Sequence, residues 1–128
     1  MPRLALLLAL ALPAAHAAEQ QLPELLQQVA RDSSVGTPRA INADILDRGY
    51  SAEGSELINH LSVRAAHAAQ MRAHPDSVRQ QLAASVCANQ GYLRLLARGA
   101  ALRYEFSEYP GNAPVASVRF IKSDCALP

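Results

Sequence analysis

The stretch SVCANQGYLRLLARGAALRYEFSEY, residues 85–109, predicts a helix that leads directly into a strand. Asn89 is a favourable N-cap for the short helix GYLRLLARG, and Gly99 suits the position after its last turn. From Leu102 to Phe106, apolar and polar residues alternate, which is the period of a half-buried β-strand. This one stretch therefore contains both kinds of element of an α+β fold.

The residues on either side extend the same pattern. Before the stretch, Pro75 and Asp76 suit the first turn of a helix that continues to Cys87, with apolar residues at four-residue intervals. After it, YPGNAP at residues 109–114 predicts a turn, and VASVRFIKSD at residues 115–124 predicts the last strand.

The N-terminal half contains a helix and a hairpin. Apolar residues recur at helical spacing from Leu22 to Val29, and this helix should end near Ser33. Residues 45–64 predict two strands joined by a tight turn at Glu53-Gly54, because the second arm alternates strictly. A helix over residues 55–72 is the alternative, since alanine is frequent there.

The predicted order is helix, strand, strand, helix, helix, strand, strand. Residues 35–44 carry Gly36, Pro38 and Asn42 and are expected to form a connection. This order predicts an α+β fold, with an antiparallel four-stranded sheet and helices packed on one face. The length fits a single domain over residues 18–128.

The first 17 residues have the pattern of a secretory signal peptide. Arg3 precedes an apolar run from Leu4 to Leu12, and Ala15-His16-Ala17 matches a cleavage site, with cleavage expected after Ala17. We therefore expect a periplasmic or secreted protein. The apolar run is too short to span a bilayer, and no later segment is apolar enough, so no membrane span is expected.

Export also bears on the two cysteines. Cys87 and Cys125 make an even count with one possible intrachain pairing, and disulfides persist in oxidising compartments. A redox-active thiol is the alternative, but such thiols commonly lie in a C-x-x-C motif, which this sequence lacks. The sequence therefore predicts a structural disulfide between Cys87 and Cys125.

Charge is nearly balanced, with 12 basic and 11 acidic residues. A nucleic-acid partner is not expected, because it would require a basic excess on one face. Arg94, Arg98 and Arg103 do lie close together in the sequence. A solvated helix face followed by a strand edge is the favoured interpretation, and an anion site is the alternative.

Motifs for chemistry are weak. His60, His67 and His74 are spaced by seven residues and would share a face of one continuous helix, where they could bind zinc. His60 falls in a predicted strand and His74 directly precedes Pro75, so we expect no metal site. The sequence contains no G-x-S-x-G, G-x-G-x-x-G or Walker motif, so we expect neither catalytic residues nor a cofactor.

A contact surface is easier to predict than a catalytic one. In the strand after Gly99, the side chains of Leu102, Tyr104 and Phe106 should face the core. Arg103, Glu105 and Tyr109 should then face outward, and this mixture of residue types is typical of an interface. We predict that these three residues contact a protein partner.

Several segments resemble a known family. They are ELINHLSVRAAHAAQMR at residues 56–72, RQQLAASVCANQGYLRLLARGAALRYEFSE at residues 79–108 and the closing SDC at residues 123–125. They resemble the putative quorum-sensing-regulated virulence factors, small exported proteins best known from pseudomonads. The resemblance implies an α+β fold and a secreted or periplasmic product linked to virulence. It implies no catalytic residues.

These observations together favour an exported, non-enzymatic interaction protein. A periplasmic inhibitor, immunity protein or secretion-assembly factor is the alternative, and a small metal-dependent enzyme is a third, less favoured class. Fold class alone does not choose between them.

Overall fold

The computed structural model describes residues 21–126, so the predicted signal peptide lies outside the described residues. The elements in chain order are α2 (Leu22–Ser33), β1 (Arg39–Ala40), β2 (Ile45–Glu53), β3 (Glu56–Arg64), α3 (Ala65–Ala73), α4 (Pro75–Cys87), α5 (Gln90–Ala97), β4 (Ala101–Tyr109), β5 (Pro114–Phe120) and a final 3-10 turn (Lys122–Asp124). The predicted first helix, the hairpin, the helix from Pro75 and the last two strands are all present.

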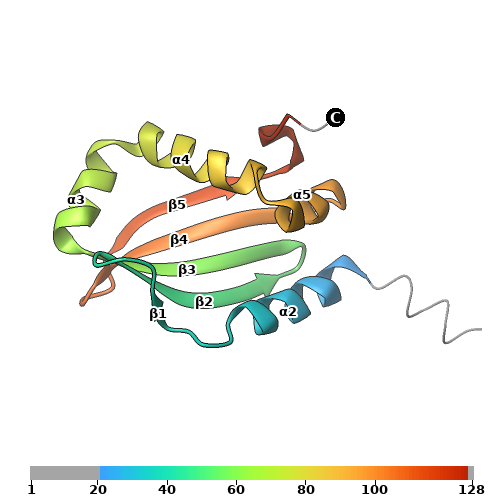
Figure 1. The fold of residues 1–128 in the computed structure, drawn as a ribbon, viewed down its shortest axis with the longest axis horizontal. Coiled ribbons are helices and arrows are strands. Elements are labelled where there is room, and N and C mark those ends of the chain that lie inside the picture. The colour runs from blue at the N-terminus through green and yellow to red at the C-terminus, as the bar shows by residue number, and fades with distance from the viewer. Residues whose placement is uncertain (1–20, 127–128) are drawn as a thin grey trace, which may run out of the picture.

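The sheet differs from the prediction in strand number and direction. It has five strands in the order β1-β2-β3-β4-β5. The pair β3 and β4 is parallel and the other pairs are antiparallel, so the expected four-stranded antiparallel sheet is wrong. The reason is that α3, α4 and α5 carry the chain back along the sheet, so that β4 starts at the same end as β3 (Figure 1).

Two short elements account for the other differences. The connection at residues 35–44 includes the two-residue strand β1, which pairs with Leu46 and Asp47 of β2. The alternation of β3 ends at Arg64, and the alanine-rich segment after it forms α3. The helical alternative for residues 55–72 is therefore correct only from Ala65 onward.

One face of the sheet carries the core, as predicted. Buried residues of α2, α4 and α5 pack over Leu57 of β3, Leu102 of β4 and Phe120 of the edge strand β5. A second cluster joins Ala68 and Met71 of α3 to residues of β3 and β4. In Figure 1, α3 and α5 lie at opposite ends of the sheet and α4 connects them alongside β5.

A bulge in β2 depends on Gly49. The register shifts between Asp47 and Gly49, and Gly49 has a φ of +104°. The buried Asp47 carboxylate accepts hydrogen bonds from Gly49 N at 2.9 Å and from Asn59 Nδ2 at 3.0 Å. The next residue, Tyr50, donates its backbone N–H to Ser34 Oγ at 2.8 Å. The bulge thus joins the end of α2 to the sheet.

Three tyrosines form a polar group within the core. The hydroxyls of Tyr50 and Tyr92 are 2.8 Å apart, and Tyr92 also bonds to Tyr104. Burial raises the pKa of both Tyr50 and Tyr104 well above the ordinary tyrosine value, and the hydrogen bonds to Tyr92 raise it further. The fold therefore favours the neutral form of the Tyr50 and Tyr104 hydroxyls.

A disulfide joins Cys87 at the end of α4 to Cys125 after the last strand, which is the pairing that the sequence predicts. Arg79 of α4 reinforces this connection. Its guanidinium lies 4.6 Å from the centre of the Phe120 ring and 3.2 Å from Asp124 Oδ1. The C-terminal segment is thus held on α4 by a covalent bond and by contacts to one arginine.

Gly49→Ala should destabilise the fold by about 2–3 kcal/mol, because an L residue is strained at this φ. A Cβ there would also lie 2.9 Å from Thr37 Oγ1 and 3.1 Å from Ser34 Oγ. Gly54→Ala is the matched control, since Gly54 also has positive φ but has open space around it. It should cost about 1 kcal/mol. Equal losses in urea unfolding would contradict the role given to the bulge.

The tyrosine group predicts loss of stability at alkaline pH. The raised pKa in the folded state means that the unfolded chain ionises first, so stability is constant below about pH 10 and falls as the pH rises further. Tyr50→Phe should make this fall shallower in urea unfolding measured across the alkaline range. Tyr109→Phe, at an exposed tyrosine, should leave the slope as it is in the wild type.

Replacing both cysteines by serine should lower the free energy of unfolding by about 2–4 kcal/mol, because the unfolded chain regains the freedom of the closed loop. Urea unfolding of the wild type without reductant, compared with the double variant, measures this loss. Titration of the folded wild type with a thiol reagent should find no reactive cysteine.

Candidate protein-binding surface beside helix α5

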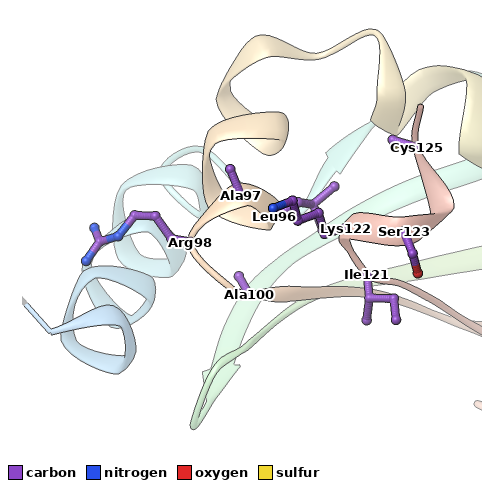
Figure 2. Close-up of a pocket in the computed structure, with 9 residues that line it drawn as sticks. Leu96, Ala97, Arg98, Ala100, Ile121, Lys122, Ser123 and Cys125 are labelled. Carbon is purple, nitrogen blue, oxygen red and sulfur yellow. The ribbon is translucent and has the colours of Figure 1, made fainter. Parts of the chain in front are cut away.

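A surface hollow lies between the end of α5 and the C-terminal segment (Figure 2). It has a volume of about 640 Å³ and is lined by Leu96, Ala97, Arg98, Gly99, Ala100, Ile121, Lys122, Ser123 and Cys125. Most of these side chains are apolar, and Ile121 is 42% exposed although it directly follows the buried Phe120. The hollow therefore presents apolar surface to solvent.

A second hollow lies between α2 and α5. Its volume is about 450 Å³, and it is lined by Leu25, Val29, Asn89, Gly91, Tyr92, Arg94, Leu95 and Arg98. Arg98 lines both hollows, so they adjoin at the end of α5. Figure 2 shows the Arg98 side chain extending from this end toward α2. We call the residues that line the two hollows the α5 surface.

The charges of the α5 surface have one sign. Its charged residues are Arg94, Arg98 and Lys122, and no aspartate or glutamate lines either hollow. The whole chain, in contrast, has a net charge of only +1. An apolar surface with cationic groups at its border favours a ligand that is apolar and carries negative charge.

Local sequence explains why α5 presents this surface. Asn89 caps the helix by accepting a hydrogen bond from Tyr92 N at 3.0 Å, and Gly99 follows the helix with a φ of +100°, as predicted. Leu95 and Leu96 are buried, whereas Arg94 and Arg98 follow the exposed side four residues apart. Sequence reasoning identified this helix and its arginines but missed the hollows, because they join segments that are distant in the chain.

The three residues predicted as an interface lie on the helix-free face of the sheet. Arg103 and Glu105 contact each other, with Nε 2.9 Å from Oε1, and Arg103 also contacts Glu56 at 2.9 Å. These two residues thus belong to an ion-pair layer within the protein. Tyr109, at the end of β4, is 48% exposed and lines a separate hollow of about 180 Å³ beside residues 40–46. The structure brings Arg103 and Glu105 together and leaves Tyr109 apart.

Side chains cap both edges of the sheet. On β5, Arg72 donates to Pro114 O at 2.7 Å and Arg79 donates to Arg119 O at 3.2 Å. On the other side, the two-residue β1 leaves most of β2 without a neighbour, and there Gln27 donates to Ala52 O at 3.1 Å and Ser34 bonds to both backbone groups of Tyr50. Edge strands protected in this way are poor acceptors of an added strand. A partner is therefore more favourably placed at the α5 surface than along an edge.

The three histidines do not share a face. His60 lies on the helix-free face, where its Nε2 is 2.7 Å from Ser51 Oγ. His67 and His74 line a hollow between α3 and α4 at the other side of the sheet. Within residues 21–126, no group of three or more histidine, cysteine, aspartate or glutamate side chains is placed to hold a metal. That the chain is not an enzyme and has no cofactor stays a prediction.

Comparison with solved structures finds the same fold in secretion proteins. Two pilotins of type II secretion systems, EpsS from Vibrio vulnificus and AspS from Vibrio cholerae, have TM-scores of 0.71 and 0.67. The alignments cover 88% and 86% of this chain and 98% and 99% of the pilotins. The sequence identities are only 12% and 20%, so these matches establish the fold alone.

Within residues 21–126, no helix is long and apolar enough to cross a membrane. The comparison with curated proteins finds no matching sequence.

Two further comparisons establish the family. A putative secreted protein of known structure from Pseudomonas aeruginosa is 63% identical, with a TM-score of 0.80 and coverage of 81% of this chain and 92% of that one. The family model for putative quorum-sensing-regulated virulence factors matches residues 15–126, and the chain therefore belongs to that family.

Proposed function

We propose that this protein is an exported, non-enzymatic binding protein that assists the assembly of a secretion apparatus by holding a segment of a partner protein on its α5 surface. The observation that carries this proposal is the α5 surface itself, with two adjoining apolar hollows and a cationic border. Exposed apolar patches of this kind mark sites of protein interaction more often than sites of chemistry.

The likeness to pilotins supports the assembly role. Nearly the whole length of each pilotin aligns with this chain, so the shared part is the complete small domain and not one motif within it. Fold does not determine function, so the assembly role rests on the α5 surface together with the shared fold and not on the fold alone. The 63% identical protein is described as secreted, which agrees with export.

The α5 surface is better suited to binding than the helix-free face. On that face, Arg103 contacts Glu53, Glu56 and Glu105, and Arg119 contacts Glu56. A partner that covered these groups would have to desolvate pairs that already satisfy one another. No aspartate or glutamate lines the α5 surface, so a partner that brings anionic groups close to Arg94 and Lys122 would be complementary in charge.

Tyr109 supports a second candidate surface. It is exposed at the end of β4 beside its own hollow, and tyrosine is enriched at protein interfaces. If the partner bound at this region, the protein would still be an exported binding protein, but the α5 surface would not contact the partner. The two candidates predict different effects of substitution.

Arg94→Glu should weaken binding of the partner by about tenfold or more, because it reverses a charge at the border of the α5 surface. Arg31→Glu is the matched control, since both arginines are exposed in the last turn of a helix and, of the two, Arg94 lines the hollow between α2 and α5. Both variants should keep their stability within about 0.5 kcal/mol of the wild type. Tyr109→Ala should leave binding unchanged.

The measurement uses a host strain that lacks the gene. Complementation is followed by the amount of assembled secretion apparatus and of secreted protein, and the partner is identified by site-specific crosslinking from position 94. Loss of binding in Tyr109→Ala but not in Arg94→Glu would move the site to the second surface. Normal secretion and assembly in the deletion strain would overturn the proposed function.

A further inference from the structure

The hollow between α3 and α4 has a distinctive lining. Its volume is about 370 Å³, and its lining residues are His67, Gln70, Met71, His74, Ser77, Val78 and Gln81. All of these side chains are uncharged or imidazole, and none carries a carboxylate. Figure 1 places α3, and the start of α4 that follows it, at the end of the sheet that is opposite to α5. The hollow is thus separate from the α5 surface.

Helix geometry brings three metal-ligating side chains onto one side of α3. His67, Met71 and His74 are at positions i, i+4 and i+7, which fall within about 60° of one another around a helix of 3.6 residues per turn. The two histidines are separated by about 10 Å along the helix, with Met71 between them. Both imidazoles line one hollow, so an ion held between them would require a rotamer of His67 that turns toward Met71.

The break between α3 and α4 does not remove His74 from this arrangement. His74 is the C-cap of α3, and its backbone N–H donates to Gln70 O at 3.1 Å and to Met71 O at 3.2 Å. Its position therefore still follows the helix. Pro75 starts α4 at the next residue, and α4 contributes Ser77 and Gln81 to the opposite wall of the hollow.

Both imidazoles in this hollow lack a protein partner. Within residues 21–126, the side chains of His67 and His74 have no hydrogen bond and no ion pair, whereas His60 bonds to Ser51 at 2.7 Å. Met71 is only 6% exposed and forms the floor, where it also contributes to the core. Two imidazoles and one thioether side chain thus line the same hollow.

This set of donors selects a class of metal. Hard cations such as calcium and magnesium prefer carboxylate and carbonyl oxygens, and no carboxylate lines the hollow. Soft, low-charge ions prefer thioether and imidazole ligands. We propose that His67, Met71 and His74 form a binding site for a monovalent soft metal ion of the Cu(I) type. The sequence analysis expected no metal site because His60 falls in a strand and His74 precedes Pro75, and it did not consider Met71 as a ligand.

The test titrates the purified exported protein with Ag(I), the redox-stable analogue of Cu(I), and with Cu(I) held reduced by ascorbate. The sequence has only two methionines, Met1 and Met71, so isotope labelling of the methionine methyl groups gives a spectrum in which Met71→Leu assigns the signal. The expected result is saturation at one equivalent, with shifts of the Met71 methyl and of two imidazole signals.

Variants identify the ligands. His67→Gln, His74→Gln and Met71→Leu should each weaken Ag(I) affinity by about tenfold or more, because loss of a ligand should cost at least as much as loss of a group that only orients one. His60→Gln is the matched control and should bind Ag(I) as the wild type does. Circular dichroism checks that each variant is folded. An unmoved Met71 methyl signal, or equal affinity in His60→Gln and His67→Gln, would falsify the site.

Discussion

The parallel pairing of β3 with β4 determines where the second half of the molecule can lie. Parallel neighbours need a crossover that returns the chain to the starting end of the sheet, and here residues 65–100 make that return. The crossover consists of three helices in series, which must all lie on the face that buries Leu57, Leu102 and Phe120. The helices therefore cover one face of the sheet, and the other face is covered only by the side chains of the strands themselves.

Local chemistry in the sequence predicts most of the elements but not how they pair. Asn89 and Gly99 set the two ends of α5, and both can be recognised from residue type alone. The alternation from Leu102 to Phe106 shows which side faces the core, but it is the same for a parallel and an antiparallel neighbour. The direction of pairing depends on the path of the crossover, which no single segment specifies. The hollow that Leu25 of α2 and Leu95 of α5 line together could not be predicted either, because these two helices are distant in the chain.

The helix-free face shows how a sheet can be covered without helices. Ile58 points to this face and is only 1% exposed. Arg103, its register partner on β4, reaches carboxylates of β2, β3 and β4, and Arg119 of β5 reaches Glu56. Each such exposed pair contributes at most about 1 kcal/mol, but the aliphatic stems of the arginines also cover apolar surface. Arg103 and Arg119 thus contribute to the stability of the fold, although they lie on its surface.

Hollows remain on two sides of α5, one beside α2 and one beside the C-terminal segment. The eight residues of α5 extend about 12 Å, whereas the nine residues of β4 extend about 30 Å. Gly91 adds no side chain on the side of α2, and the chain leaves the sheet after Phe120, with Ile121 partly exposed. An apolar segment bound along α5 would extend the helix layer over this end of the sheet. The surface proposed for a partner thus adjoins the buried cluster that contains Leu95 and Leu96.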